Sequence, residues 1–343
     1  MNLDKTIKEG KGVFVFSDPA GANSVFAIID YLIGNNKIHG KDFLIFTNKI
    51  GVFDQKYNRV VERVEFNDET GTNVQSNFNP DYIFSATSLN NFEHLWRIFF
   101  FKKIKVYSFI DHWCNYYKRF YFEDQLCFGN EVWVIDEEAS KEAIEEGIPK
   151  NLIRVKGNPY YEKVKMFKPV VSRKLFFEAC NINEDKIIIL FISDDIRTVF
   201  GIDKKGDCIL GFDEYSVLTD VLETLNNLWR NNKLKGSKYQ FVIKIHPNAN
   251  FHKFDRLIKK HDFLDIKIIK DCDPLTINFY SNYIFGMFSN MVIESFLMKK
   301  NLLRVQTGQL TSDIIKVKGI KDEVVKDIDN LYGEMSIFFS SNY

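Results

Sequence analysis

The feature that most constrains this chain is a regular succession of short apolar runs, each followed by a polar turn and a segment of helical periodicity. This alternation predicts parallel βαβ units with right-handed crossovers, because each helix returns the chain to start the next strand in the same direction. The runs lie at 13–17, 42–47, 81–85, 104–110 and 131–136, and then at 186–193, 239–246, 266–270, 283–287 and 301–305. Helices are predicted at 22–34, 88–101, 138–147, 214–231, 251–261 and 289–300.

A segment at 157–173, punctuated by Gly and Pro, separates the two series of runs. We therefore predict an α/β protein with two Rossmann-like parallel-sheet domains facing a cleft, a preferred place for a ligand. The predicted domains are residues 1–158 and 173–320, joined by a linker at 159–172. Architecture alone suggests that a helix in the remaining residues, 321–343, packs back on the first domain. A loop or lid is predicted at 194–213, where the apolar period is lost.

Composition and charge exclude several classes of protein. The 46 basic residues balance the 46 acidic ones, so no net charge drives binding to nucleic acid, and we expect no such partner. The five dispersed cysteines form no CxxC pair, which is typical of a reducing compartment and argues against a disulfide framework or zinc site. The polar N-terminus predicts no signal peptide, and no apolar window is long enough to span a bilayer.

We therefore expect a soluble, cytoplasmic protein. The segment 96–105 combines aromatic and basic residues, which leaves open a peripheral association with the inner face of the membrane. The preferred interpretation of this segment is a buried strand flanked by solvated lysines. The sequence does not indicate an oligomeric state.

In the first domain, polar residues follow two predicted strands. After the first strand comes a tight turn with small side chains at a helix start, whose amides could receive an anionic group. The candidate residues of this turn are Ser17, Asp18, Gly21 and Asn23. Asp111 and His112 follow the fourth strand, and such a pair can supply a general base and a group that orients a substrate hydroxyl. The structural alternatives are a glycine turn with capping side chains, and an N-capping Asp beside a solvated His.

In the second domain, Ser193 and Asp194 follow the first strand, and Asp195 comes next. Two adjacent carboxylates could hold a divalent cation, but neighbouring side chains on an extended chain point apart, so we favour capping and expect no required metal. The next strand ends abruptly at His246 and Pro247, where open α/β sheets bind ligands. The alternative is that the proline only ends the strand and sets the loop.

A fourth strand of the second domain leads through Gly286 into a helix. Ser289 and Asn290 fit its N-cap, and the helix N-terminus would suit a phosphate. Glu294 lies among apolar residues about one turn into the helix. A half-buried acid needs a partner, and a ribose or sugar diol offers two donors to one carboxylate. The alternative is an exposed or self-capping acid near the positive end of the helix.

The spacing of these motifs resembles the GT-B glycosyltransferases. A strand ending in His246-Pro247 is followed about forty residues later by Gly286, Ser289 and Glu294 in the pattern strand–GxxSxxxxE–helix. The residues at 111–113 resemble a first-domain segment of that superfamily, and 157–161, which includes Asn158, resembles its hinge. The motifs are most similar to bacterial sialyltransferases, Kdo transferases and CDP-glycerol polymer transferases. In those families the histidine and the serine turn contact the cytidylate phosphate.

The chain departs from that pattern in two places. Ser289-Asn290 replaces the serine pair of those families, and the acidic-acidic-Gly motif that carries their base has no clear equivalent. Asp111 would substitute for that base by position only. The candidate residues for binding the substrate or nucleotide are therefore those of the first-domain turn, Asn158 at the hinge, and the second-domain residues Ser193, Asp194, His246, Pro247, Gly286, Ser289, Asn290 and Glu294.

The main functional hypothesis is a metal-independent glycosyltransferase of surface polysaccharide assembly, such as capsule or lipopolysaccharide. It would use a nucleotide-sugar donor, a CMP-sugar being favoured over a UDP-sugar, and a glycan or lipid-linked acceptor. The nucleotide-sugar is a co-substrate, so no cofactor is expected. One alternative is a nucleotide-sugar epimerase or hydrolase of the same fold, which would consume the donor with no acceptor present. A second is a catalytically silent protein that binds a nucleotide or glycan.

Overall fold

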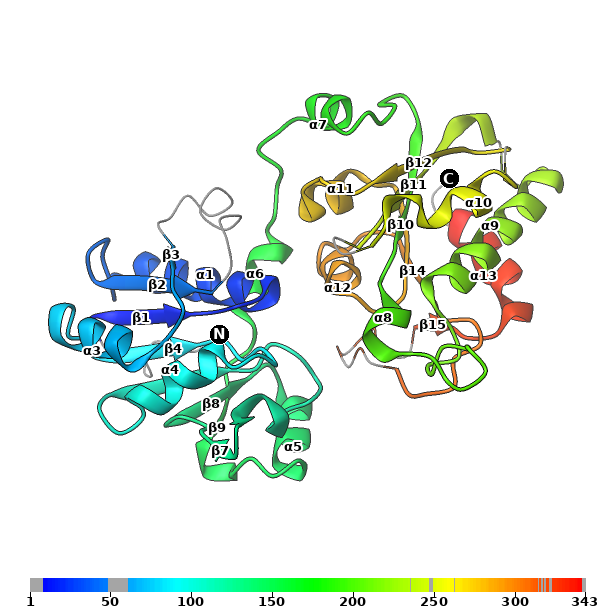
Figure 1. The fold of residues 1–343 in the computed structure, drawn as a ribbon. Coiled ribbons are helices and arrows are strands. Elements are labelled where there is room, and N and C mark those ends of the chain that lie inside the picture. The colour runs from blue at the N-terminus through cyan, green and yellow to red at the C-terminus, as the bar shows by residue number, and fades with distance from the viewer. Residues whose placement is uncertain are drawn as a thin grey trace. The chain divides into compact units, whose positions relative to one another are not determined.

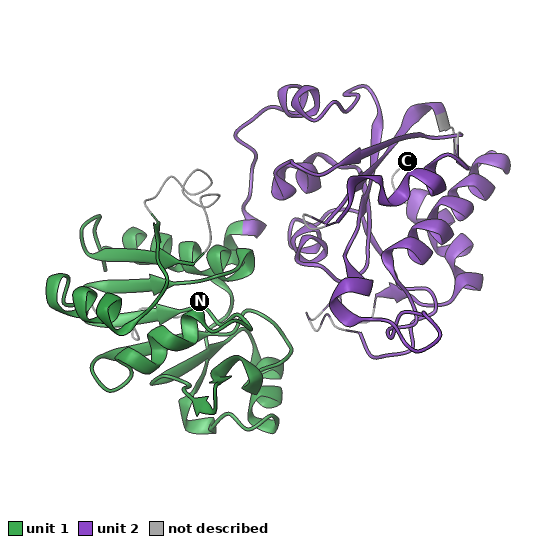
Figure 2. Ribbon diagram, in the orientation of Figure 1, with its two compact units in different colours: residues 1–163 green, residues 164–343 purple. Residues whose placement is uncertain are grey.

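The computed structural model describes residues 9–48, 61–234, 236–246, 249–261, 263–313, 315, 317, 319–320 and 323–340. The chain divides into two compact units, residues 1–163 (unit 1) and 164–343 (unit 2), which are coloured green and purple in Figure 2. Within the described residues no helix combines the length and apolar character that crossing a membrane requires.

Within its described residues, unit 1 contains a seven-stranded parallel sheet in the order β3-β2-β1-β4-β5-β8-β9 (Figure 1). Its strands are β1 (Gly12–Val15), β2 (Phe43–Thr47), β3 (Glu62–Arg63), β4 (Tyr82–Ser85), β5 (Lys105–Phe109), β8 (Glu131–Val134) and β9 (Ile153–Val155), and a small hairpin pairs β6 (Tyr121–Phe122) with β7 (Gln125–Leu126). Its helices are α1 (Pro19–Gly34), α3 (Asp68–Asn77), α4 (Phe92–Phe100), α5 (Glu137–Glu145), α6 (Pro159–Lys165), which reaches the boundary of the units, and the 3-10 turns η1 (Tyr117–Phe120) and η2 (Lys150–Leu152).

In the described part of unit 2, a six-stranded parallel sheet has the order β12-β11-β10-β13-β14-β15. Its strands are β10 (Ile187–Ile192), β11 (Tyr239–Lys244), β12 (Asp265–Ile269), β13 (Tyr283–Gly286), β14 (Leu302–Val305) and β15 (Val324–Val325). Its helices are α7 (Arg173–Ala179), α8 (Ile196–Phe200), α9 (Glu214–Arg230), α10 (Asp255–Ile258), α11 (Pro274–Tyr280), α12 (Asn290–Leu297) and α13 (Ile328–Ser340), with the 3-10 turns η3 (Gly236–Lys238) and η4 (Phe251–Phe254).

Helices cover both faces of each sheet, because successive side chains along a strand point to opposite faces and the apolar ones need cover on each. In β1 and the residue after it, Phe14 and Phe16 pack with the apolar side of α1, whereas Val13 and Val15 pack with Trp96 and its neighbours on α4. Successive side chains of a strand point to opposite faces, so a run that is apolar throughout requires cover on both. The prediction of two Rossmann-like parallel-sheet domains is thus confirmed.

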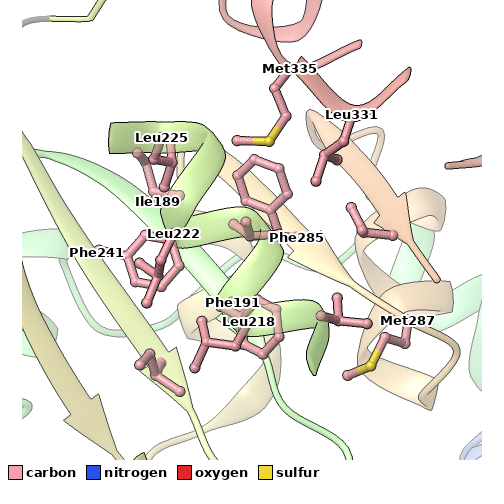
Figure 3. Packing of buried hydrophobic residues seen from close by; sticks show 14 of the residues in the cluster. Ile189, Phe191, Leu218, Leu222, Leu225, Phe241, Phe285, Met287, Leu331 and Met335 are labelled. Atoms are coloured by element: carbon pink, nitrogen blue, oxygen red, sulfur yellow. The ribbon is translucent and has the colours of Figure 1, made fainter. Parts of the chain in front are cut away.

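The core of unit 2 lies between the sheet and the helices α9 and α13. Phe191, Phe241 and Phe285 of the sheet contact apolar side chains of α9, as Figure 3 shows. From α13, Leu331, Met335 and Phe339 enter the same core and are almost fully buried. The helix for which the sequence suggested packing on the first domain therefore buries its apolar side within unit 2, because the face of α9 and the edge near β15 offer it an apolar surface.

The aromatic segment at 96–105 is not the buried strand that the sequence favoured. Its first half is the end of α4, where Trp96 and Phe100 are one helical turn apart and both fully buried. Lys103 lies just after the helix, with its Nζ 3.1 Å from the ring centroid of Phe99. The aromatic rings that suggested a membrane contact therefore lie largely in the core of unit 1, and only Phe101 is exposed, at 38%.

Candidate functional site

Each sheet has a point where the strand order reverses, and open α/β sheets bind ligands beyond the carboxyl ends of the strands at such a point. In unit 2 the reversal falls between β10 and β13, and in unit 1 it falls between β1 and β4. The ends of β1, β10 and β13, with the loops and helices that follow them, carry most of the residues that the sequence singled out. We describe the two sites separately, as the unit 2 site and the unit 1 site.

In the unit 2 site, Asp194 links the loops after β10 and β13. Its side chain is buried, and its Oδ2 accepts a hydrogen bond from the backbone N–H of Phe288 at 3.5 Å. Burial raises the pKa of Asp194 to about 7, although the Phe288 amide and the Ser289 hydroxyl both favour the charged form. Ser193, also buried, continues the sheet by donating its N–H to Lys244 O at 2.9 Å. The predicted polar residues Ser193 and Asp194 are therefore buried and stabilise the backbone of the loops around them.

A charged network lies beside this loop. Glu214, the first residue of α9, is fully buried and accepts a hydrogen bond from Ile196 N at 3.0 Å while forming an ion pair with Lys253. The same ammonium lies 3.6 Å from Asp195 Oδ1. His246 is close enough to feel these charges: burial lowers its pKa, the carboxylates of Asp195 and Glu214 raise it, and neighbouring lysines lower it. Burial is the largest of these effects, so the lowered pKa favours the neutral imidazole.

The start of α12 forms the other wall of the unit 2 site. Ser289 has the extended N-cap conformation and Asn290 is the first helical residue. Gly286 is needed for close packing, because a Cβ at this position would lie 2.5 Å from Cγ2 of Val292. Glu294 is buried at 4% exposure, so the interpretation of an exposed acid is wrong, whereas that of a self-capping acid stays a prediction. Pro247, the other residue proposed for this wall, lies outside the described residues.

Two side chains hold the turn between β13 and α12: Arg304 from strand β14 and Gln306 from just after that strand. Arg304 Nε and Gln306 Nε2 each donate to the carbonyl oxygen of Met287 at 3.0 Å. Arg304 also makes a bidentate pair with Asp313, with both N···O distances at 2.6 Å. Since Arg304 is 1% exposed, these contacts compensate a buried charge and fix the backbone that precedes the helix N-terminus.

The unit 1 site contains a buried network of hydroxyl groups around a carboxyl group. Ser17 after β1 and Ser88 after β4 both donate to the carboxylate of Glu93, each at 2.7 Å. Asn90 Nδ2 donates to the Ser17 oxygen at 2.5 Å. Burial raises the pKa of Glu93, and the two serine hydroxyls partly offset that effect. Ser17 thus joins the loops after β1 and β4 at the reversal of strand order.

A second acidic group of the unit 1 site combines Asp18 and Asp111. Asp18 caps α1 by accepting from Gly21 N at 2.6 Å, and its pKa is raised by burial and by the nearby charge of Asp111. His112 Nε2 lies 3.8 Å from Asp111 Oδ1. Like the histidine, Arg119 lowers the pKa of Asp18. The residues after β1 and β5 therefore come together, as their positions at the carboxyl ends of parallel strands predicted.

Three other predicted residues lie in, or directly before, the helices α1 and α6. Gly21 allows the first turn of α1 to approach β4, since a Cβ there would lie 2.8 Å from Cβ of Ala86. Asn158 is buried and accepts from Tyr160 N at 3.0 Å, so its side chain supports the start of α6. Asn23 lies half-buried within the second turn of α1.

Sequence reasoning missed several buried or half-buried charged residues that complete both sites. They are Glu93 and Arg119 in unit 1, and Glu214, Lys253 and Arg304 in unit 2. Arg304 carries a usable signal, because it is a charge inside an otherwise apolar segment, and such a charge needs a partner. In the part of the chain that the structure describes, no three His, Cys, Asp or Glu residues gather to hold a metal ion.

No protein-family model and no curated protein sequence matches this chain. Solved structures do. A UDP-N-acetylglucosamine 2-epimerase described as putative, from Listeria monocytogenes, has a TM-score of 0.67 at 14% identity, over 97% of this chain and 88% of that one. The UDP-GlcNAc 2-epimerase from Methanocaldococcus jannaschii has a TM-score of 0.65 at 14% identity, over 97% and 93%. That from Neisseria meningitidis, bound to UDP-GlcNAc, has a TM-score of 0.63 at 15% identity, over 96% and 93%.

At these identities the similarity establishes the fold, and it confirms the GT-B-type pair of Rossmann-like domains. It also corrects the main functional hypothesis. The glycosyltransferase interpretation, with its CMP-sugar donor and its glycan or lipid-linked acceptor, is wrong, because the similar structures along nearly the whole chain are described as UDP-GlcNAc 2-epimerases. The specific likeness to sialyltransferases and their relatives is likewise not supported. The comparisons favour the alternative, a nucleotide-sugar epimerase of the same fold.

Proposed function

We propose that this protein is a nucleotide-sugar epimerase that binds a uridine diphosphate sugar. The observation that carries the proposal is the similarity of fold, over 96% and 97% of the chain, to UDP-GlcNAc 2-epimerases, one of them solved with UDP-GlcNAc. Polar residues at the reversal of strand order in both sheets support it independently, since this is where such sheets bind ligands.

The unit 2 site would hold the diphosphate. The backbone amides at the half-buried start of α12 and the partial positive charge of the helix end favour an anion, and Arg304 and Gln306 hold the preceding turn in place. His246, whose lowered pKa favours the neutral imidazole, would donate one hydrogen bond to a phosphate oxygen. Glu294, buried one turn into the helix, would accept hydrogen bonds from hydroxyl groups of the ribose or sugar.

The unit 1 site would supply the groups for proton transfer. Inversion at a sugar carbon requires that a hydrogen leave one face and that another be delivered to the opposite face, so one group must take a proton and another must give one. Asp18 and Asp111 are neighbouring carboxyl groups, and the raised pKa of Asp18 suits a proton donor. His112, beside Asp111, is the third group of this set that can exchange a proton.

The binding half of the proposal is tested by isothermal titration with UDP and UDP-GlcNAc. His246→Ala should weaken UDP binding by roughly 10-fold or more, the effect of losing a hydrogen bond to a charged group. Glu294→Gln should weaken UDP-GlcNAc binding similarly.

Arg230→Ala is the matched control, because this exposed residue ends the 17-residue helix α9, about 25 Å from Glu214 at its start. UDP affinity that is unchanged in both site variants would exclude the unit 2 site.

The catalytic half is tested by product analysis after incubation with UDP-GlcNAc alone. An epimerase should give the 2-epimer of the sugar nucleotide without any acceptor. Asp111→Asn should lower the turnover by roughly 100-fold or more, the usual contribution of a general acid or base, while leaving UDP affinity intact. Formation of UDP and free sugar without an epimer would instead favour the hydrolase alternative.

A further inference from the structure

A pocket of about 840 Å³ lies in unit 2 at the end of α12, and we call it the α12 pocket. Its volume is that of a small-molecule site, which typically measures about 300–1,000 Å³. The last turn of α12 and the residues after it form one side, the start of β14 a second, and Ile320 and Glu323 a third. The unit 2 site lies at the other end of α12, about 12 Å away, because the helix has eight residues and rises about 1.5 Å per residue.

Hydrogen bonds and close packing hold the sides of the α12 pocket in place. Arg304 Nη1 donates to Ile320 O at 2.8 Å, and the bidentate pair with Asp313 fixes the guanidinium group that makes this bond. Gly319, directly before Ile320, lies against α12, since a Cβ at this glycine would lie 3.3 Å from Cζ of Phe296. The turn at Ile320 is therefore attached to both β14 and α12, and the pocket between them is a fixed part of the folded unit.

The lining of the α12 pocket combines apolar side chains with amino groups. Among its charged residues, Arg304 is already paired with Asp313, and Glu323 supplies a single carboxylate. Three lysines line the pocket with that one carboxylate, so the local charge is positive. The apolar lining residues are Phe296, Leu297, Met298, Leu302 and Ile320, and the lysines are Lys165, Lys299 and Lys300.

Lys300 is a half-buried ammonium group without a carboxylate partner among the described residues. Its Nζ donates to the carbonyl oxygen of Phe279 at 2.7 Å, which uses one of its three N–H groups. Burial lowers the pKa of Lys300, with no neighbouring carboxylate to offset this effect. Its neighbour Lys299 is exposed and likewise forms no ion pair with a described residue. An anion placed here would therefore gain charge-assisted hydrogen bonds that the protein itself does not supply.

We propose that the α12 pocket is a binding site for a small amphipathic carboxylate. The carboxylate would accept hydrogen bonds from Lys299 and Lys300, and the apolar body would lie on the side chains of α12 and β14. Both halves of the lining require this class of ligand. A hydrated anion such as inorganic phosphate would leave the apolar side chains in water, and a neutral apolar molecule would leave the ammonium of Lys300 without its counter-ion.

The test is isothermal titration of the folded protein with decanoate, kept monomeric below its micelle concentration. We expect saturable binding at one site per chain with a Kd below about 1 mM. Acetate, which has the carboxylate without the chain, and decyltrimethylammonium, which has the chain with the opposite charge, should each bind roughly 10-fold more weakly or less.

Substitutions locate the ligand in the α12 pocket. Lys299→Glu should weaken decanoate binding by roughly 10-fold or more, because it replaces a hydrogen bond to a charged group by repulsion. Met298→Gln, which keeps the size of the side chain and adds a polar amide, should weaken it several-fold. Lys260→Glu is the matched control, because it reverses the charge of an exposed lysine before β12, the strand at the other edge of the sheet, and should leave the affinity unchanged.

Three results would overturn the proposal. The first is the absence of saturable decanoate binding, and the second is equal affinity for decyltrimethylammonium. The third is decanoate binding that is lost in His246→Ala but kept in Lys299→Glu, since it would place the ligand in the unit 2 site. Circular dichroism of each variant confirms that it is folded before titration. None of these outcomes depends on whether the protein binds UDP or acts on a UDP-sugar, so the proposed function is tested separately.

Discussion

Replacing Asp194 by Asn should remove the loss of unfolding free energy that the wild type suffers when the pH rises and its buried carboxyl group ionises. In the unfolded chain the carboxyl group has its ordinary pKa of 3.8, whereas in the folded protein burial raises the pKa to about 7. Between these values the folded state holds a proton that the unfolded state has lost, so the free energy of unfolding falls as the pH rises and levels off above 7. Each pH unit inside the window changes it by about 1.4 kcal/mol, which gives about 2–3 kcal/mol between pH 5 and pH 8.

Asn has nearly the same shape as Asp, can accept the hydrogen bond from Phe288 N, and does not titrate. The difference in unfolding free energy between Asp194→Asn and the wild type should therefore increase by about 2–3 kcal/mol, in favour of the variant, from pH 5 to pH 8. Urea denaturation followed by circular dichroism at four pH values measures it. Asp185→Asn, at an exposed position of the same unit, should follow the wild-type profile. A constant difference for Asp194→Asn across this range would refute the raised pKa and the role of burial in causing it.

Other substitutions test the remaining supports of the two sites. Gly286→Ala should lower the unfolding free energy by about 1–3 kcal/mol in chemical denaturation, because its Cβ would overlap Val292 and push α12 from the sheet. Arg304→Ala should lower it by about 3–5 kcal/mol, because it leaves the buried Asp313 carboxylate without its partner, and a smaller loss than 1 kcal/mol would contradict that pairing. Glu93→Ala should lower the Tm far more than Glu93→Gln, since Gln can still accept a hydrogen bond from one serine hydroxyl and donate one to the oxygen of the other; equal losses would argue against the network.

Most of the central strands could be predicted to within two residues, because each is an apolar run between polar turns. The predicted run at 239–246, for example, corresponds to β11 at Tyr239–Lys244. The elements that escaped prediction are those without such a run. Strands β3 and β15 are two-residue edge strands, and α3 is a polar helix in which only Gly71 and Val74 are buried. Their structure depends on contacts with the rest of the sheet, which the local pattern does not record.

The sequence predicted where the candidate sites lie in the fold, but it did not predict which residues their side chains contact. Parallel topology places every strand end at the same edge of its sheet, so Asp111, His246 and Ser289 were expected there. The partners come from distant parts of the chain: Asp194 is bonded to a residue 94 positions away, and Ser17 to one 76 positions away. The same residues also illustrate that fold does not determine reaction, since the motif pattern suggested a glycosyltransferase whereas the similar structures are described as epimerases.

The central claim is that this protein inverts a carbon of a UDP-sugar by proton transfer. Its most direct test is ¹H NMR of UDP-GlcNAc incubated with the protein in D₂O, with no acceptor present. Carboxyl groups exchange their protons with solvent, so the account predicts that the 2-epimer appears with deuterium at C2 and that Asp111→Asn slows its appearance by roughly 100-fold or more. UDP-GlcNAc that keeps both its configuration and its C2 hydrogen, under conditions in which titration shows it bound, would contradict the claim.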